Sequence, residues 1–120
     1  MRKVLVVEDE ANIRKFVAIN LSARGYEVVE AGSASEGLDR LRDSAPELLL
    51  LDIKLPDMSG WEMLRVMAAD PELPKIPVVV ITASLGSSAS GYETYEKLLK
   101  VLIKPVSAQE LTHAVREALS

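Results

Sequence analysis

The sequence predicts an α/β domain built on a five-stranded parallel sheet with helices on both faces. Three observations predict it. Runs such as LLLL and VVVI carry no polar alternation, which is the pattern of strands buried on both faces. Segments with helical periodicity separate the runs, and right-handed crossovers between parallel strands leave few other topologies. The five expected strands are residues 3–7, 28–30, 48–51, 78–81 and 101–103.

Local signals place the first two helices. Apolar residues at helical spacing run from Ile13 to Leu21, so one face of this segment can pack on the sheet. Gly25 follows and can adopt the left-handed conformation that often ends a helix. Residues 33–36 read Ser-Ala-Ser-Glu and match the capping box, in which a hydroxyl and a carboxylate bind free N–H groups at a helix start. The second helix should therefore begin here.

The second half of the chain continues the alternation. Residues 57–60 form a turn that leads into a helix starting near Trp61, and we expect that indole to lie in the core. Residues 84–95 are rich in Gly and Ser, so the fourth helix expected there should be short or frayed. A second capping box at residues 107–110 marks the start of the last helix.

Composition limits the classes of protein that need to be considered. The 120 residues are 48% apolar and 27% charged, as in an ordinary globular domain, and we expect one domain spanning residues 1–120. No apolar run approaches the ~20 residues of a membrane-spanning helix. The net charge of −4 offers no basic surface for direct nucleic-acid binding. Because there is no cysteine, a cytoplasmic location is the default expectation.

Polar residues follow four of the five predicted strands. In an open parallel sheet, ligand-binding residues gather at the carboxyl ends of the strands, so these residues should meet at one edge. They are Glu8, Asp9 and Glu10 after the first strand, Asp52 after the third, Thr82 after the fourth and Lys104 after the fifth; the small Ala83 follows Thr82, and Pro105 follows Lys104.

The chemistry of this group indicates a magnesium site beside a phosphoryl group. Two carboxylates ~4 Å apart repel by ~4 kcal/mol at an effective dielectric near 20, so the acidic cluster calls for a cation. Carboxylate oxygens suit Mg²⁺, whose coordination is often completed by phosphate. Lys104 and Thr82 can bind phosphoryl oxygens, and the small Ala83 leaves space for them. Asp52 is the best candidate nucleophile, since a carboxylate can form an acyl phosphate.

The motifs VVEDE, LLLLDIKLPDMSG, VVVITA and IKP resemble the receiver domains of bacterial two-component response regulators over nearly the whole chain. This resemblance implies a flavodoxin-like (CheY-like) fold with strand order 2-1-3-4-5. It also implies that Asp52 is the phosphoacceptor. Mg²⁺ would be bound by Glu8, Asp9, Asp52 and the backbone carbonyl of Lys54. Thr82 would reorient on phosphorylation, Lys104 would contact the phosphoryl group, and a cis peptide would precede Pro105.

The sequence departs from the family pattern near the fifth strand. Receivers commonly carry Tyr or Phe three residues before the lysine, where this chain has Val101. A Gly-Ala pair that is common before that strand is replaced by residues 97–100, Lys-Leu-Leu-Lys. Tyr92 or Tyr95 could supply the missing aromatic ring from the preceding segment.

The resemblance implies a signalling switch that is not a turnover enzyme and only assists its own phosphorylation and dephosphorylation. A histidine kinase or phosphotransfer protein would supply the phosphoryl group. A downstream effector protein or domain would bind the face formed by the fourth helix, fifth strand and last helix, and a phosphorylation-dependent homodimer is another form of output. The alternative is a pseudo-receiver that signals without phosphorylation, which Val101 leaves open. A remote alternative is a haloacid-dehalogenase-type phosphatase, although Lys54 occupies the place of its second Asp.

Overall fold

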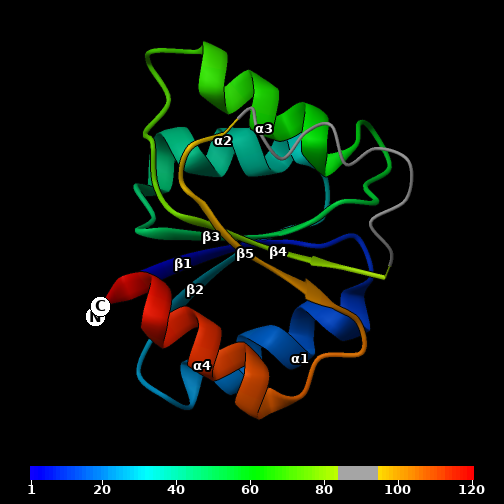
Figure 1. Cartoon of the computed structure of the whole chain (residues 1–120), viewed down its shortest axis with the longest axis vertical. Coiled ribbons are helices and arrows are strands. Elements are labelled where there is room, and N and C mark those ends of the chain that lie inside the picture. The colour runs from blue at the N-terminus through cyan, green and yellow to red at the C-terminus, as the bar shows by residue number, and fades with distance from the viewer. Residues whose placement is uncertain (84–94) are drawn as a thin grey trace.

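The computed structural model describes residues 1–83 and 95–120 and shows one parallel sheet with the strand order β2-β1-β3-β4-β5. Figure 1 shows α2 and α3 on one face of this sheet and α1 and α4 on the other. The expected layers and strand order are both confirmed. The strands are β1 (Lys3–Val7), β2 (Glu27–Ala31), β3 (Leu48–Asp52), β4 (Val78–Thr82) and β5 (Leu98–Ile103). The helices are α1 (Ala11–Ser22), α2 (Ala34–Ser44), α3 (Gly60–Ala69) and α4 (Ala108–Leu119).

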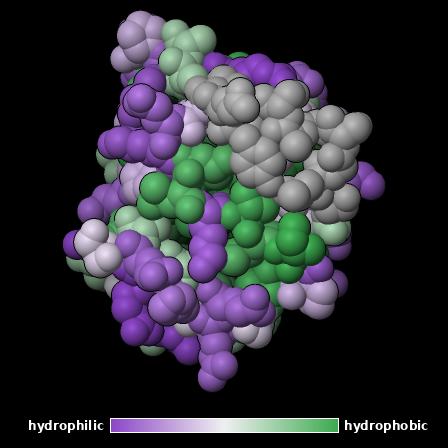
Figure 2. Space-filling view, viewed as in Figure 1, coloured by the Kyte–Doolittle hydropathy of each residue, from purple (hydrophilic) through white to green (hydrophobic). Residues whose placement is uncertain are grey.

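The β5 strand lies at the edge of the sheet and is longer than the predicted residues 101–103. It begins at Leu98, and a register shift at Val78 and Val79 interrupts its pairing with β4. Leu99 and Ile103 are 55% and 49% exposed. Figure 2, viewed as in Figure 1, shows hydrophobic surface over this part of the sheet.

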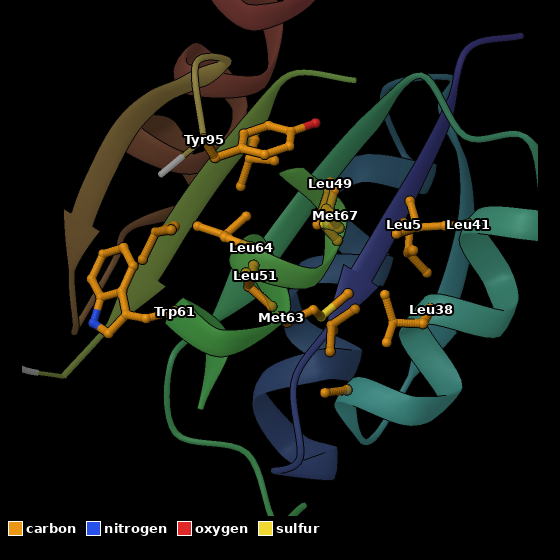
Figure 3. Close-up of a cluster of buried hydrophobic side chains, with 14 of the residues drawn as sticks. Leu5, Leu38, Leu41, Leu49, Leu51, Trp61, Met63, Leu64, Met67 and Tyr95 are labelled. Carbon is orange, nitrogen blue, oxygen red and sulfur yellow. The ribbon is translucent and has the colours of Figure 1, made fainter. Parts of the chain in front are cut away.

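Two hydrophobic clusters hold the layers together, one on each face of the sheet. Alternate residues of the LLLL run serve different clusters: Leu49 and Leu51 join the α2 and α3 side, whereas Leu48 and Leu50 join the α1 and α4 side. This division explains why β3 has no polar alternation. Figure 3 shows the first cluster, in which Trp61 is buried as expected.

The helix ends follow the sequence signals with one difference. Ser107 and Glu110 form a complete capping box at the start of α4. At α2, the Ser33 hydroxyl accepts from the Glu36 amide as predicted, but the Glu36 carboxylate accepts from the Gly32 amide instead of the Ser33 amide. The second half of that box is therefore shifted by one residue. Gly25 has a φ of 91°, which confirms its left-handed conformation after α1.

The helix expected at residues 84–95 lies outside the described part of the chain except for Tyr95. Among the helices within residues 1–83 and 95–120, none combines the length and the apolar character needed to cross a membrane.

Candidate functional site

Three acidic residues from two neighbouring strands converge at the carboxyl edge of the sheet. Val7 pairs with Leu51, so the residues that follow them, Glu8 and Asp52, come side by side. Together with Asp9, they place carboxylate oxygens within 4.8 Å of one another. Glu8 and Asp52 are only 3% and 5% exposed, whereas Asp9 is exposed. The convergence predicted from the strand ends is confirmed for these residues.

Lys104 joins this cluster from the end of the edge strand β5. Its Nζ lies 2.8 Å from Oε1 of Glu8 and 3.1 Å from Oδ2 of Asp52. The side chain starts just after β5 and reaches past β4 to contact residues of β3 and the loop after β1. The backbone N–H of Lys104 donates to the Thr82 carbonyl at 2.8 Å, and this hydrogen bond holds the Lys104 backbone in place. One cation thus bridges two buried carboxylates.

Burial and charge act in opposite directions on Glu8. Burial raises its pKa to about 7, and repulsion from Asp52 acts in the same direction. Hydrogen bonds from the Lys104 ammonium and the Glu10 amide oppose that rise. Burial also works to lower the pKa of Lys104, but its bonds to Glu8 and Asp52 outweigh this and raise that pKa. The site therefore holds a firmly charged ammonium beside a carboxyl that titrates near neutrality.

The other predicted residues lie around this cluster. Thr82 is buried at the end of β4, one residue beyond the partner of Asp52 in the β3–β4 pairing. Ala83 and Pro105 are exposed, and the Lys104–Pro105 peptide bond is cis, as the resemblance implied. Val101 is half-buried and packs against the cluster on the α2 and α3 side.

The backbone around Asp52 is tightly packed against the start of α3. The Gly60 N–H donates to the Ile53 carbonyl at 2.7 Å. A Cβ on Gly60 would lie 2.7 Å from the Asp52 carbonyl oxygen, which is closer than side-chain carbons approach backbone atoms. Glycine is therefore needed for this approach. The exposed Lys54 donates its amide toward Oδ1 of Asp52 at 3.4 Å.

Sequence reasoning missed a structural contact made by Asp57, which it treated only as part of a turn. Its carboxylate accepts from the amides of Ala34 and Ser35 at 3.0 and 2.8 Å, in the first turn of α2. The loop after Asp52 is thereby attached to the start of another helix. No local pattern could have found this contact, because it joins residues more than 20 positions apart.

The suggestion that Tyr95 replaces the missing aromatic ring is wrong. Tyr95 is buried, and its hydroxyl donates to the Ile76 carbonyl at 2.6 Å. Ile76 precedes β4, so this ring lies at the amino end of the strand, opposite the end that carries Thr82. Tyr92 lies outside the described residues.

The donor set fits a magnesium ion. Mg²⁺ prefers carboxylate oxygens and is usually held by one or two of them with water and phosphate completing an octahedron. Glu8, Asp9 and Asp52 supply such oxygens, and the exposed Asp9 leaves one side of the group open to solvent. An adjacent ammonium and a carboxylate at the edge of a parallel sheet together make an arrangement suited to phosphoryl transfer.

Comparisons with known proteins point to one family. A family model described as the response regulator receiver domain matches residues 4–116. The chain is similar to the polar-differentiation response regulator DivK of Brucella ovis, with 41% identity over 83 residues that cover 68% of this chain and 67% of DivK. It is also similar to the probable transcriptional regulator ycf27 of Guillardia theta, with 33% identity over 124 residues.

A solved structure supports the same likeness. The CheY-like response regulator receiver domain protein from Methanospirillum hungatei JF-1 superposes with a TM-score of 0.88 at 30% identity, covering 99% of this chain and 94% of that one. The match to ycf27 covers 98% of this chain but only 45% of that regulator's length. The chain thus corresponds to less than half of that relative.

Proposed function

Because the chain belongs to the response regulator receiver domain family, we propose that it is a two-component signalling switch that accepts a phosphoryl group on Asp52. One observation carries this proposal: Asp52 is a buried carboxylate held by the Lys104 ammonium within a cluster of acidic oxygens. A group in this position combines a nucleophile, a compensating cation and ligands for a metal ion. Among the acidic residues described, this set of neighbours favours Asp52 over Asp57.

In the proposed reaction, a carboxylate oxygen of Asp52 attacks phosphorus and forms a new P–O bond. The bond between phosphorus and the donor breaks, and its electron pair leaves with the donor. Lys104 already lies 3.1 Å from Asp52 and would pair with an oxygen of the incoming phosphoryl group. Thr82 would donate its hydroxyl to another. These residues bind and orient the group, and no step requires repeated turnover of a substrate.

Glu8, Asp9, Asp52 and the backbone carbonyl of Lys54 are the residues that would hold Mg²⁺. When bound, the ion supplies charge neutralisation for the transferring phosphoryl group. The protein's own contribution is to keep two buried carboxylates and one exposed carboxylate within 4.8 Å before the ion arrives.

Response regulators receive phosphoryl groups from kinases and act on effectors, so partners of both kinds are expected. We propose a histidine kinase or phosphotransfer protein as the donor in the cytoplasm. The output surface would be the face that includes β5 and α4, where Leu99 and Ile103 are exposed. The effector would be a protein, another domain or a second copy of this chain. Any effect on DNA would pass through such a partner, since the net charge is −4.

Intact-protein mass spectrometry after incubation with acetyl phosphate tests this proposal. We expect one phosphoryl adduct in the presence of Mg²⁺ and none in EDTA. Asp52→Asn should remain unmodified, whereas the matched variant Asp57→Asn should still be modified. An unmodified wild-type protein would favour the pseudo-receiver, and continuous phosphate release from a phosphate monoester would favour the phosphatase.

A further inference from the structure

The guanidinium of Arg14 contacts the loop that carries two of the three acidic residues, Glu8 and Asp9. Its Nη1 donates to the backbone carbonyl of Glu8 at 2.8 Å, and its Nε donates to Oε1 of Glu30 at 3.1 Å. Arg14 belongs to α1 and Glu30 to β2, so one side chain joins a helix, a strand and the loop between β1 and α1. Neither Arg14 nor Glu30 belongs to the acidic cluster itself.

We propose that Arg14 is a positioning residue for the metal-binding loop, because its guanidinium anchors the peptide group between Glu8 and Asp9 to Glu30. This inference rests on the proposed function and assigns a further residue to the same site. The carbonyl that Arg14 binds lies in the same peptide plane as the Asp9 N–H. Holding that carbonyl therefore restricts the backbone torsion angles on either side of this peptide group, and so the directions in which the Glu8 and Asp9 side chains project.

The Glu8 backbone is held from two sides, and only one of them depends on a side chain. The Glu8 N–H donates to the Ala31 carbonyl at 3.0 Å as a continuation of the β1–β2 pairing. The Glu8 carbonyl is held by Arg14. Substitution of Arg14 would leave the first bond in place and release the second, so the peptide plane could rotate without loss of the strand.

The contact between Arg14 and Glu30 should orient the metal-binding loop more than it stabilises the fold. The Arg14 and Glu30 side chains are 21% and 36% exposed, so water reaches both of them, and ion pairs within reach of water contribute little to folding. Mg²⁺, in contrast, demands near-ideal octahedral geometry from its ligands. Residues that orient metal ligands typically change metal affinity 10–100-fold when they are replaced. Loss of Arg14 should thus affect metal binding more than folding.

Isothermal titration of the full chain with MgCl₂ tests the inference. We expect Arg14→Gln to weaken Mg²⁺ binding by about tenfold, while its melting temperature in EDTA stays close to that of the wild type. Glu30→Gln should weaken binding less, because a neutral amide oxygen can still accept from Arg14. The double variant Arg14→Gln/Glu30→Gln should bind Mg²⁺ no more weakly than Arg14→Gln alone, because both substitutions break the same linkage.

Arg24→Gln is the matched control, because Arg24 also donates to a backbone carbonyl, that of Asn20, but far from the acidic residues. It should bind Mg²⁺ like the wild type. If Arg14→Gln does not fold, Arg14→Lys provides the test. Its Mg²⁺ affinity should fall by a few-fold, because a single ammonium cannot keep the contacts to both Glu30 and the Glu8 carbonyl. Unchanged affinity in a folded Arg14 variant, or equal losses at Arg14 and Arg24, would overturn the inference alone. Wild-type protein that takes up no Mg²⁺ would overturn the proposed function and this inference together.

Discussion

Glu8 is the residue at which burial and charge conflict most directly. It is nearly as inaccessible as the core leucines, yet it lies beside Asp52 and needs its own charge to bind a metal ion. Lys104 reduces the conflict by pairing with both carboxylates in the metal-free protein. A bound divalent cation would take over part of that role and leave the ammonium available to a phosphoryl group.

The raised pKa of Glu8 predicts that magnesium binding depends on pH near neutrality. A carboxyl with a pKa of about 7 must lose its proton to become a ligand, so the apparent affinity should fall about tenfold between pH 8 and pH 6. Calorimetric titrations at both pH values measure this change. In Glu8→Gln, binding should be weaker and lose this dependence; a flat profile in the wild type would contradict the prediction.

The raised pKa of Glu8 also makes the free energy of unfolding of the metal-free protein depend on pH. The folded protein binds the Glu8 proton more tightly than the unfolded chain does, because a glutamate in the unfolded chain has its ordinary pKa of 4.5. In EDTA, the Glu8 contribution to the free energy of unfolding should therefore decrease as pH rises from 4.5 to about 7 and then level off. Urea denaturation of the wild type and Glu8→Gln across this range isolates that contribution. A difference between the two proteins that stays constant with pH would contradict the assignment.

Gly60 should be intolerant of a side chain. In Gly60→Ala the new Cβ would lie 2.7 Å from the Asp52 carbonyl oxygen and 2.9 Å from Cα of Ile53, and backbone atoms cannot rotate away. We expect a loss of about 1–3 kcal/mol in the free energy of unfolding, together with slower modification by acetyl phosphate. Gly32→Ala is the control, because its Cβ would meet only the ends of two flexible side chains, Nη1 of Arg14 at 3.4 Å and Oε1 of Glu36 at 3.9 Å. Equal stability of the two variants would show that the packing around Asp52 is loose.

At the scale of elements, the loop between β3 and α3 is held both where its ends meet and at its middle. Gly60 attaches its end to Ile53, and Asp57 attaches its middle to the first turn of α2. Slight burial works to raise the pKa of Asp57, but the hydrogen bonds it accepts outweigh this and lower that pKa. The α2 helix is therefore stabilised by a residue that lies outside it.

Asp57→Ala should destabilise the protein by about 1 kcal/mol, as loss of a helix cap does. Because the Asp57 pKa is lower in the folded protein, this stabilisation is present above its ordinary value of 3.8 and is lost as pH falls through the folded value. Urea denaturation at neutral and acidic pH should show the wild type and variant converging in acid. A gap that persists in acid would mean that the carboxylate charge is not responsible.

Tyr95 anchors the segment before β5 to the segment before β4, and this role can be separated from phosphorylation. Tyr95→Phe should cost about 1–2 kcal/mol by removing the hydrogen bond to the Ile76 carbonyl. Its rate of modification by acetyl phosphate should match that of the wild type, because the ring lies at the opposite end of β4 from Thr82. Unchanged stability with an altered rate would instead place Tyr95 in the switch.

At the scale of the whole molecule, the layered fold was predictable because its signal is repeated along the chain. Each buried strand serves two hydrophobic clusters, so runs such as LLLL and VVVI identify a covered parallel sheet without knowledge of the partners. The site followed from the same reasoning, since parallel strands bring their carboxyl ends to one edge. Asp52, Glu8 and Lys104 could therefore be grouped before any distance was known.

The remaining features depend on contacts that no local pattern records. Asp57 binds amides near α2, and Arg14 pairs with Glu30 on β2, so each contact depends on how separate elements pack. The early start of β5 depends on the register shift opposite Val78. These contacts become visible only after the chain has folded.

Site mapping of the phosphoryl group tests the central claim most directly. Sodium borohydride reduces an acyl phosphate to an alcohol, so Asp52 should become homoserine after treatment with acetyl phosphate and Mg²⁺ followed by reduction. Peptide mass spectrometry should find this change at residue 52 and at no other aspartate, and only when Mg²⁺ is present. Homoserine at Asp9 or Asp57, or no reduced aspartate at all, would contradict the assignment of Asp52 as the phosphoacceptor.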